Sequence, residues 1–178
     1  RQATPQQLAD SGLPAGAAAC WHARGGWVRP PRLIRQLLDH PGITWHGDCS
    51  VARLHRGEEA PGLWQALDGA GQPLAQAELV IVCAGPQSMA LAGAPWPVQP
   101  LRGQIAWGLH TQAARQAPWP PQPLNGHGNL VPQVPMPGGL GWVLGSTFER
   151  DQTTLPPSAT DAAQGLAANL ARLQTLAP

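Results

Sequence analysis

Residues 129–146 read NLVPQVPMPGGLGWVLGS. Side-chain character alternates from Asn129 to Val134 and again from Gly141 to Ser146, and Pro137-Gly138-Gly139 separates the two segments. Alternation with a period of two predicts strands, and the Pro-Gly-Gly run predicts a turn between them. The stretch therefore predicts two neighbouring strands of an antiparallel sheet.

Helices are predicted at three places. Thr4-Pro5-Gln6-Gln7 combines a threonine cap, a proline and a glutamine that together start a short helix. Apolar residues repeat with helical spacing over 31–39, and His40-Pro41-Gly42 ends that helix. Residues 158–176 form an amphipathic helix capped by Ser158 or Thr160.

Further strands are predicted where the period changes to two. They lie in 43–54, as one strand or as two separated by a turn at Gly47-Asp48, in 63–67 before a tight turn at Asp68-Gly69, and in 101–107. The run Leu79-Val80-Ile81-Val82-Cys83-Ala84-Gly85 is continuously apolar and rich in β-branched residues. Strands buried on both faces of a sheet have this composition, so the run predicts a central parallel strand. Helices and both kinds of strand together predict a mixed α+β fold.

Composition excludes several classes of protein. With 43% hydrophobic residues the 178-residue chain can bury a core, yet only 12% of its residues are charged, about half the usual share. The surface is therefore expected to be unusually apolar. No stretch reaches the roughly 18 apolar residues that span a bilayer, so we expect a soluble protein with no membrane partner. Three cysteines without CxxC spacing predict neither a disulfide framework nor a zinc site, and favour a reducing compartment.

A few residues are candidates for chemistry. The small residues Ala84 and Gly85 after an apolar strand suit the close approach of a nucleotide, or an ordinary tight turn. Arg102 with Gln104 could hold a carboxylate, or Arg102 could face solvent at a strand end. His127 lies between glycines in a loop that is free to reach a ligand. Cys83 has apolar neighbours and is expected to be a small buried side chain rather than a nucleophile.

Basic and aromatic residues alternate in 22–35, where Arg24, Arg29, Arg32 and Arg35 surround Trp27. Such a segment could hold phosphates and stack a base, or it could be the polar side of an ordinary surface helix. The formal net charge of +1 argues against a free-standing nucleic-acid binder. The sequence has no GxGxxG after a strand, no P-loop, no GxSxG and no histidine spacing typical of a metal site.

The order of several motifs resembles the D-amino-acid-oxidase-like FAD-dependent oxidoreductases. The matching segments are Gly25-Gly26-Trp27-Val28-Arg29-Pro30-Pro31-Arg32-Leu33, Val80–Gly85, Pro100-Leu101-Arg102-Gly103-Gln104 and Gly145-Ser146-Thr147-Phe148-Glu149. Within that superfamily the chain looks most like the oxidoreductase halves of bifunctional tRNA-modifying enzymes that make methylaminomethyl-thiouridine. The resemblance implies FAD as cofactor, tRNA as partner of the full-length protein, a cytoplasmic location, and oxidation of the C–N bond of a glycine-type secondary amine. In that family the reaction removes carboxymethyl from carboxymethylaminomethyl-uridine at the wobble position.

The same resemblance implies roles for individual residues. Val51, Cys83, Ala84 and Gly85 match positions beside the FAD adenosine and pyrophosphate. Arg102, Gly103 and Gln104 match the first substrate-domain strand, which makes Arg102 and Gln104, with the loop residue His127, the candidates for substrate binding. The catalytic residues themselves are not identified.

The resemblance also implies an architecture: an antiparallel substrate-domain sheet with flanking helices plus part of an FAD-binding α/β domain. Residues 1–27 and 91–178 are assigned to the substrate domain and 28–90 to the FAD-binding domain. Because the dinucleotide fingerprint is absent, we expect a fragment that lacks its Rossmann half, does not hold FAD by itself and is inactive in isolation. An exposed apolar patch is expected beside Val80–Gly85. Two other functions stay open: a glycine- or sarcosine-type amine oxidase without RNA, and a non-catalytic binding module.

Overall fold

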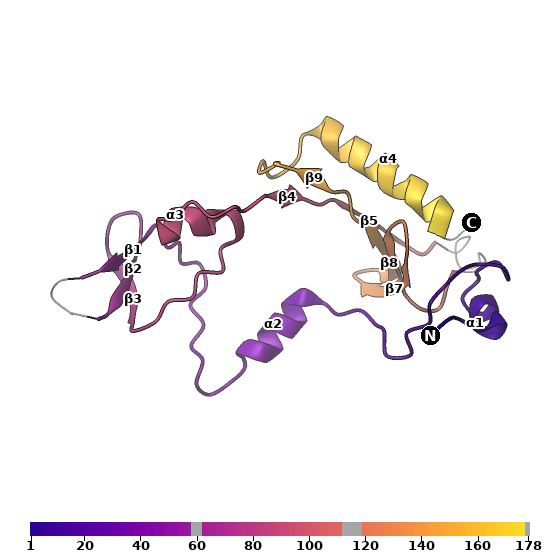
Figure 1. Cartoon of the computed structure of the whole chain (residues 1–178), viewed down its shortest axis with the longest axis horizontal. Helices are drawn as coiled ribbons and strands as arrows, with labels where there is room; N and C mark the ends of the chain where they lie inside the picture. The colour runs from indigo at the N-terminus through magenta and orange to yellow at the C-terminus, as the bar shows by residue number, and fades with distance from the viewer. Residues whose placement is uncertain (58–61, 112–118, 177–178) are drawn as a thin grey trace. The chain divides into compact units, whose positions relative to one another are not determined.

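The computed structural model describes residues 1–57, 62–111 and 119–176. The chain divides into two compact units: unit 1 comprises Arg1–Arg29 with Leu101–Pro178, and unit 2 comprises Pro30–Pro100 (Figure 1). Both units contain helices and antiparallel strands, so the predicted mixed α+β fold is confirmed. Assignment of the units to substrate-binding and FAD-binding domains stays a prediction. Of the helices in the described ranges, none has the length and apolar character that crossing a membrane requires.

Unit 1 is built around a four-stranded antiparallel sheet. Its strands are β5 (Ile105–Leu109), β6 (Leu124–Asn125), β7 (Asn129–Met136) and β8 (Gly139–Gly145), in the order β5-β8-β7-β6. The predicted hairpin over 129–146 is therefore confirmed as β7 and β8. Gly138 and Gly139 make its turn, and both have the positive φ that glycine adopts without strain.

A short pair of strands extends unit 1 beyond this sheet. Strand β4 (Leu101–Arg102) pairs with β9 (Glu149–Arg150), so the predicted strand over 101–107 is split into β4 and β5. Helix α1 (Pro5–Asp10) has the expected capping box, in which the Thr4 hydroxyl and the Gln7 amide each accept the other residue's backbone N–H. The capping motif was thus readable from sequence alone.

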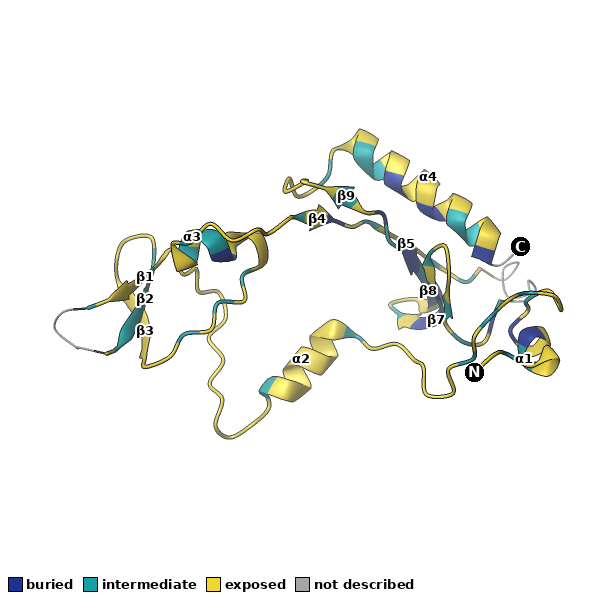
Figure 2. Cartoon of the chain, viewed as in Figure 1, coloured by how far each residue is buried: buried dark blue, intermediate teal, exposed yellow. Residues whose placement is uncertain are grey.

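Helix α4 (Ala159–Leu176) packs on the strands of unit 1. As predicted, Ser158 caps it by accepting the backbone N–H of Asp161 at 3.1 Å. Leu130 and Leu144, both fully buried, form the core with Leu176, and buried positions recur along the helix (Figure 2). Partly buried side chains surround this core: Trp119, Leu124, Trp142 and Leu173. The rings of Trp119 and Trp142 stack at 5.9 Å.

Unit 2 contains a three-stranded antiparallel meander. Its elements are α2 (Pro30–Leu38), β1 (Arg53–Arg56), β2 (Trp64–Leu67), β3 (Pro73–Ala77), the 3-10 helix η1 (Gly85–Gln87) and α3 (Ser88–Ala92). Helix α2 and strand β2 were predicted from sequence, whereas β3 was not. The tight turn after β2 is confirmed, since the Asp68 carboxylate accepts the backbone N–H groups of Ala70 and Gln72.

One predicted strand of unit 2 is wrong, and a second prediction is only partly right. Residues 79–84 form no strand, and Leu79 and Ile81 are 74% and 78% exposed. A strand buried on both faces needs strands beside it and layers over it, and the described residues provide neither. Cys83 is exposed rather than buried for the same reason. In the region 43–54, where one strand or two were predicted, residues 43–52 form no strand and Trp45 is 69% exposed, whereas Leu54 lies in β1.

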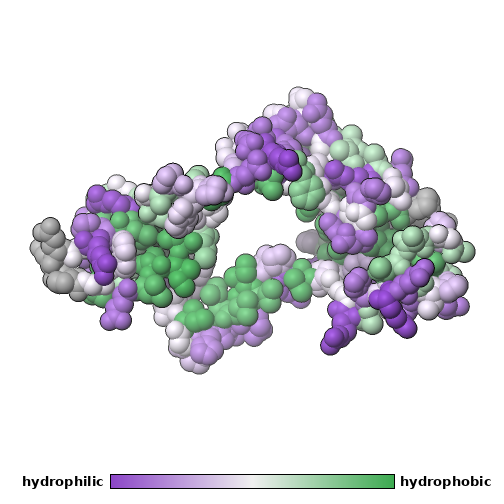
Figure 3. All heavy atoms as spheres, in the orientation of Figure 1, coloured by the Kyte–Doolittle hydropathy of each residue, from purple (hydrophilic) through white to green (hydrophobic). Residues whose placement is uncertain are grey.

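The exposed apolar patch expected beside Val80–Gly85 is present. Leu79 and Ile81 expose most of their surface, and the apolar residues of α2 are exposed as well. Figure 3 shows hydrophobic residues gathered over α2 and over the part of unit 2 that holds the meander. Patches of this kind usually contact another protein segment or a ligand.

We expect Leu144→Ala to lower the free energy of unfolding of unit 1 by about 2–5 kcal/mol, because it leaves a cavity in the core. Urea titration followed by tryptophan fluorescence measures this change. Leu140→Ala, in the same strand but 47% exposed, is the matched control and should cost much less. Equal losses in the two variants would contradict the assigned core.

Candidate functional site

One face of the sheet in unit 1 is open and apolar. Ile105, Trp107 and Leu109 alternate along β5 and are 53%, 63% and 41% exposed, whereas Ala106 between them is buried. Trp107 pairs with Val143 of β8, which pairs in turn with Val131 of β7, so these three side chains lie on the same side. We call Ile105, Trp107, Leu109, Val131 and Val143 the open sheet face.

Glycine keeps this face shallow beside Ile105. Gly145 is the cross-strand partner of Ile105, and a Cβ at Gly145 would lie 2.8 Å from the Ile105 Cγ2 atom. Real Cβ atoms do not approach so closely, so a larger residue would push Ile105 away from the strand. A flat, apolar surface with one large indole is the kind of wall that a planar aromatic group can pack against.

The α4 side of unit 1 carries an ion-pair cluster around Arg102 of β4, whose guanidinium is buried while its carboxylate partners are partly exposed. The Arg102 side chain is 7% exposed and pairs with Glu149 and Asp161, the latter at 2.8 Å from Nη2 to Oδ2. Nε also donates to Glu149 Oε2 at 3.0 Å, and Nη1 donates to the Thr154 carbonyl at 3.2 Å. Hydrogen bonding to Arg102 lowers the pKa of Asp161 below its ordinary value, against the opposing effect of desolvation. The same bonds raise the pKa of Arg102.

Gln104 connects the strands to helix α4. Its main-chain oxygen accepts a hydrogen bond from Asn169 Nδ2 at 2.8 Å, and Asn169 is fully buried. Its side-chain Nε2 donates to the Ala162 carbonyl at 2.7 Å, and its backbone N–H donates to the Thr147 hydroxyl at 2.9 Å. Arg172, one turn further along α4 than Asn169, donates to the Ser146 carbonyl at 2.8 Å. These bonds form what we call the polar seam between α4 and the strands.

The structure brings two of the three predicted substrate-binding residues together. Arg102 and Gln104 both lie on the α4 side, two positions apart, and their side chains already bond to protein groups. His127 is exposed in the turn between β6 and β7 and has no hydrogen bond to either of them within the described ranges. Direct contact of these residues with a substrate therefore stays a prediction.

Sequence reasoning missed the open sheet face. Period-two alternation from Arg102 onward places residues 102, 104 and 106 on one side and 105, 107 and 109 on the other. The alternation is visible in the sequence, but the sequence does not show which side of β5 helix α4 covers. Ile105 and Trp107 are candidates for ligand contact that only the packing of α4 identifies.

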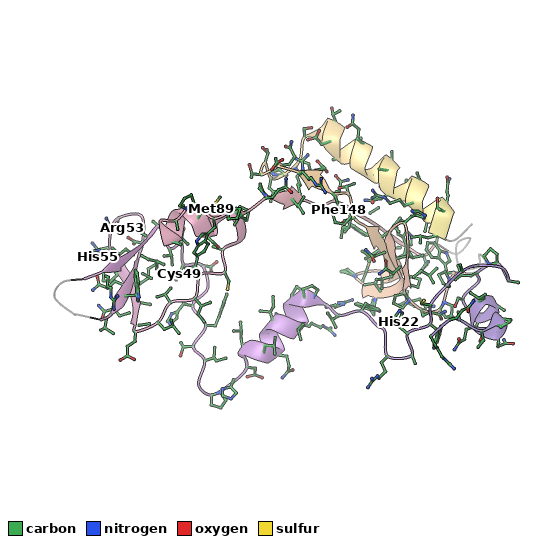
Figure 4. All side chains as sticks on the ribbon, in the orientation of Figure 1. His22, Cys49, Arg53, His55, Met89 and Phe148 are labelled. Atoms are coloured by element: carbon green, nitrogen blue, oxygen red, sulfur yellow. The ribbon has the colours of Figure 1, made fainter. Side chains whose placement is uncertain are left out.

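The four residues matched to FAD contacts all lie in unit 2. Val51 precedes β1, while Cys83, Ala84 and Gly85 lead into η1 and α3, and α3 packs beside β1. Figure 4 shows Met89 on α3 and Arg53 and His55 on β1. The backbone N–H of Ala84 donates to the Ser88 hydroxyl at 3.0 Å, and Gly85 has a φ of +57°. The turn at Gly85 thus requires a residue that tolerates the left-handed region.

Comparison with known proteins establishes the family. A family model described as FAD dependent oxidoreductase matches residues 2–178. The chain belongs to the FAD-dependent oxidoreductases. It is also similar to proteins named tRNA 5-methylaminomethyl-2-thiouridine biosynthesis bifunctional protein MnmC. The resemblance inferred from the sequence motifs is thereby confirmed.

Three of these relatives illustrate the similarity. The protein of Acidovorax sp. (strain JS42) is 59% identical over 179 residues, which cover all of this chain and 28% of the relative. That of Delftia acidovorans is 54% identical over all of this chain and 29% of its own length. That of Verminephrobacter eiseniae is 51% identical over 96% of this chain and 28% of its own length. No solved structure matches the chain.

The residues of this FAD-dependent oxidoreductase chain fit one part of an FAD site. Exposed Leu79 and Ile81, followed by Ala84 and the left-handed Gly85, form an apolar segment ending in a small-residue turn that a cofactor could approach. A GxGxxG fingerprint, whose backbone N–H groups hold a pyrophosphate, is not among the motifs of these 178 residues. Within the described ranges no cluster of three or more His, Cys, Asp and Glu side chains could hold a metal ion.

The Arg102–Asp161 pair predicts a dependence of stability on pH. Because the pKa of Asp161 is lower in the folded than in the unfolded chain, its stabilisation is present above the unfolded pKa of about 4 and is lost as the pH falls through the folded value. We expect the melting temperature of unit 1 to fall less on acidification in Asp161→Asn than in the wild type.

Asp10→Asn is the matched control for this experiment, since the Asp10 carboxylate accepts its hydrogen bond from the neutral amide of Gln6 at 2.7 Å. Melting curves followed by circular dichroism between about pH 6 and pH 2 give the comparison. A wild type and an Asp161→Asn variant with parallel pH profiles would refute the assigned role of the ion pair.

Proposed function

We propose that this chain forms part of an FAD-dependent oxidoreductase that modifies the wobble uridine of tRNA. The reaction would oxidise the C–N bond of a glycine-type secondary amine and so remove carboxymethyl from carboxymethylaminomethyl-uridine. The observation that carries the proposal is the 59% identity over the whole chain to a protein named for tRNA methylaminomethyl-thiouridine biosynthesis. The chain spans about 28% of that relative's length. Action on tRNA would place the protein in the cytoplasm.

In this proposal the open sheet face bounds the space where the amine is held. Trp107, with Ile105 and Leu109 beside it, offers an apolar wall that excludes water from the reacting carbon and orients a planar base. When bound, FAD supplies the acceptor of two electrons for the oxidation of the C–N bond. The chain's own residues therefore contribute by positioning the amine and excluding water rather than by acid–base chemistry.

We also propose roles for the matched residues. Val51, Cys83, Ala84 and Gly85 would lie along the adenosine and pyrophosphate of FAD, where small residues permit close approach. Gln104 and Arg102 would hold β4 and β5 against α4, and a substrate carboxylate could reach Arg102 only if an ion pair to Glu149 or Asp161 opened. His127 would contact substrate from its exposed turn.

We expect the isolated 178-residue chain not to retain FAD, because an apolar wall without a pyrophosphate cradle does not hold a dinucleotide. Equilibrium dialysis against FAD, read by flavin fluorescence, measures retention. The full-length relative from Acidovorax sp. (strain JS42) serves as the positive control. A yellow purified chain with a flavin spectrum would contradict this expectation.

A chimera tests the proposed function directly. This chain replaces the matching segment of the Acidovorax relative, and the product is incubated with tRNA carrying carboxymethylaminomethyl-uridine. We expect carboxymethyl loss at a rate within about tenfold of the parent, since 59% identity preserves the fold of the segment. Nucleoside mass spectrometry after digestion of the tRNA measures the product.

Glycine and sarcosine are the control substrates for the same chimera. If the chimera oxidised these free amines and left tRNA unchanged, its function would be that of a small-molecule amine oxidase instead of the proposed one. A chimera that binds FAD but oxidises none of the three substrates would favour a non-catalytic module.

A further inference from the structure

The loop over residues 21–29 of unit 1 presents arginine and tryptophan side chains together at the surface. Trp21, His22, Ala23, Arg24 and Gly25 line a shallow, open hollow. Figure 4 labels His22 in this loop. Trp27 follows directly after the hollow and is 37% exposed. Nothing in the oxidoreductase chemistry described above uses these residues.

The backbone of this loop is held in place from both sides. The N–H of Trp21 donates to the Arg1 carbonyl at 2.8 Å, and the N–H of Ala3 donates to the Ala19 carbonyl at 2.9 Å. The N–H of Gly25 closes a turn on the His22 carbonyl at 2.9 Å. These bonds hold the backbone at Trp21 and place the main chain of Arg1 beside it. A preorganised surface loses little conformational entropy when a ligand binds.

Among the described residues, no carboxylate forms an ion pair with the arginines of this loop. Residues 1–29 contain Arg1, Arg24 and Arg29 but one carboxylate, Asp10, which bonds to Gln6. Both ion pairs found among the described residues belong to Arg102, so Arg24 has no acidic partner there. Arg29 donates to the Pro135 carbonyl and lies 5.9 Å from the ring of Trp27, which anchors that indole. Arg24, which forms no ion pair among the described residues and lines the same hollow as Trp21, is open to an anion that also carries an aromatic ring.

We propose that this loop is a contact site for single-stranded RNA, with a phosphate on Arg24 and a base stacked on Trp21. This inference rests on the proposed function, because it names the surface through which the tRNA would bind. A single strand fits better than a duplex, since stacking on an indole needs a base that has left its helical stack. The local excess of arginine over carboxylate supplies the attraction that the overall charge of +1 does not.

Variants of the chimera test the site by tRNA binding and by turnover. We expect Arg24→Gln to weaken tRNA binding about five- to tenfold and to reduce the slope of log affinity against log salt by about one, because one phosphate contact is lost. Trp21→Leu should weaken binding without changing that slope, because stacking is not ionic. Both variants should raise KM for tRNA and leave kcat unchanged.

Arg150→Gln and Trp96→Leu are the matched controls. Arg150 is an exposed arginine of unit 1 on β9, and Trp96 is a 51% exposed tryptophan of unit 2. Fluorescence anisotropy with labelled tRNA at several salt concentrations gives affinities and slopes, and circular dichroism verifies that each variant is folded. The proposed site would be wrong if Arg24→Gln kept the wild-type affinity for tRNA and the wild-type salt dependence. It would also be wrong if Arg150→Gln lost as much affinity for tRNA as Arg24→Gln.

Failure of the inference can be told apart from failure of the proposed function. A wild-type chimera that modifies tRNA, with an Arg24→Gln variant of unchanged affinity, overturns the loop site alone. A wild-type chimera that neither binds nor modifies tRNA overturns both.

Discussion

The hydrogen bond from Asn169 Nδ2 to the main-chain oxygen of Gln104, 2.8 Å long and fully buried on the asparagine side, joins helix α4 to the strands of unit 1. A buried amide left without its partner costs free energy, so the helix has one favourable position on the sheet. Leu130 and Leu144 of the sheet pack with Leu176 of α4 to form the core. Helix α4 covers this side of β5, and Ile105, Trp107 and Leu109 on the other side remain exposed.

The ion-pair cluster on the α4 side also changes how Arg102 is understood. A guanidinium at a strand end resembles a ligand-binding group in sequence, yet here two carboxylates and a carbonyl already accept its hydrogen bonds. The ion pairs of Arg102 with Glu149 and Asp161 tie β4, β9 and the first turn of α4 together, because one guanidinium donates to both carboxylates and to the Thr154 carbonyl. The apolar residues at the alternate positions of β5, rather than the charged ones, are left facing outward.

The chain has few charged residues and exposes much apolar surface. Only 12% of residues are charged, and large apolar side chains are exposed on α2, on β5 and in the segment 79–84. Local patterns such as the capping box at Thr4 and the hairpin over 129–146 were predicted correctly, since each depends on neighbouring residues alone. The run Leu79–Ala84 was predicted as a strand and is not one, because a strand depends on partners that lie elsewhere.

The sequence by itself determined the hairpin, the three main helices, the mixed α+β class and the family, because periodicity, capping residues and motif order are local or sequential properties. It also identified Arg24 and Trp27 as a basic and aromatic segment. Only the tertiary structure decided that α4 covers the face holding Arg102 and Gln104, that Ile105 and Trp107 are uncovered, and that Arg24 lacks an acidic partner among the described residues. These are relations between residues far apart in the chain, and burial and ion pairing arise only when packing brings such residues together.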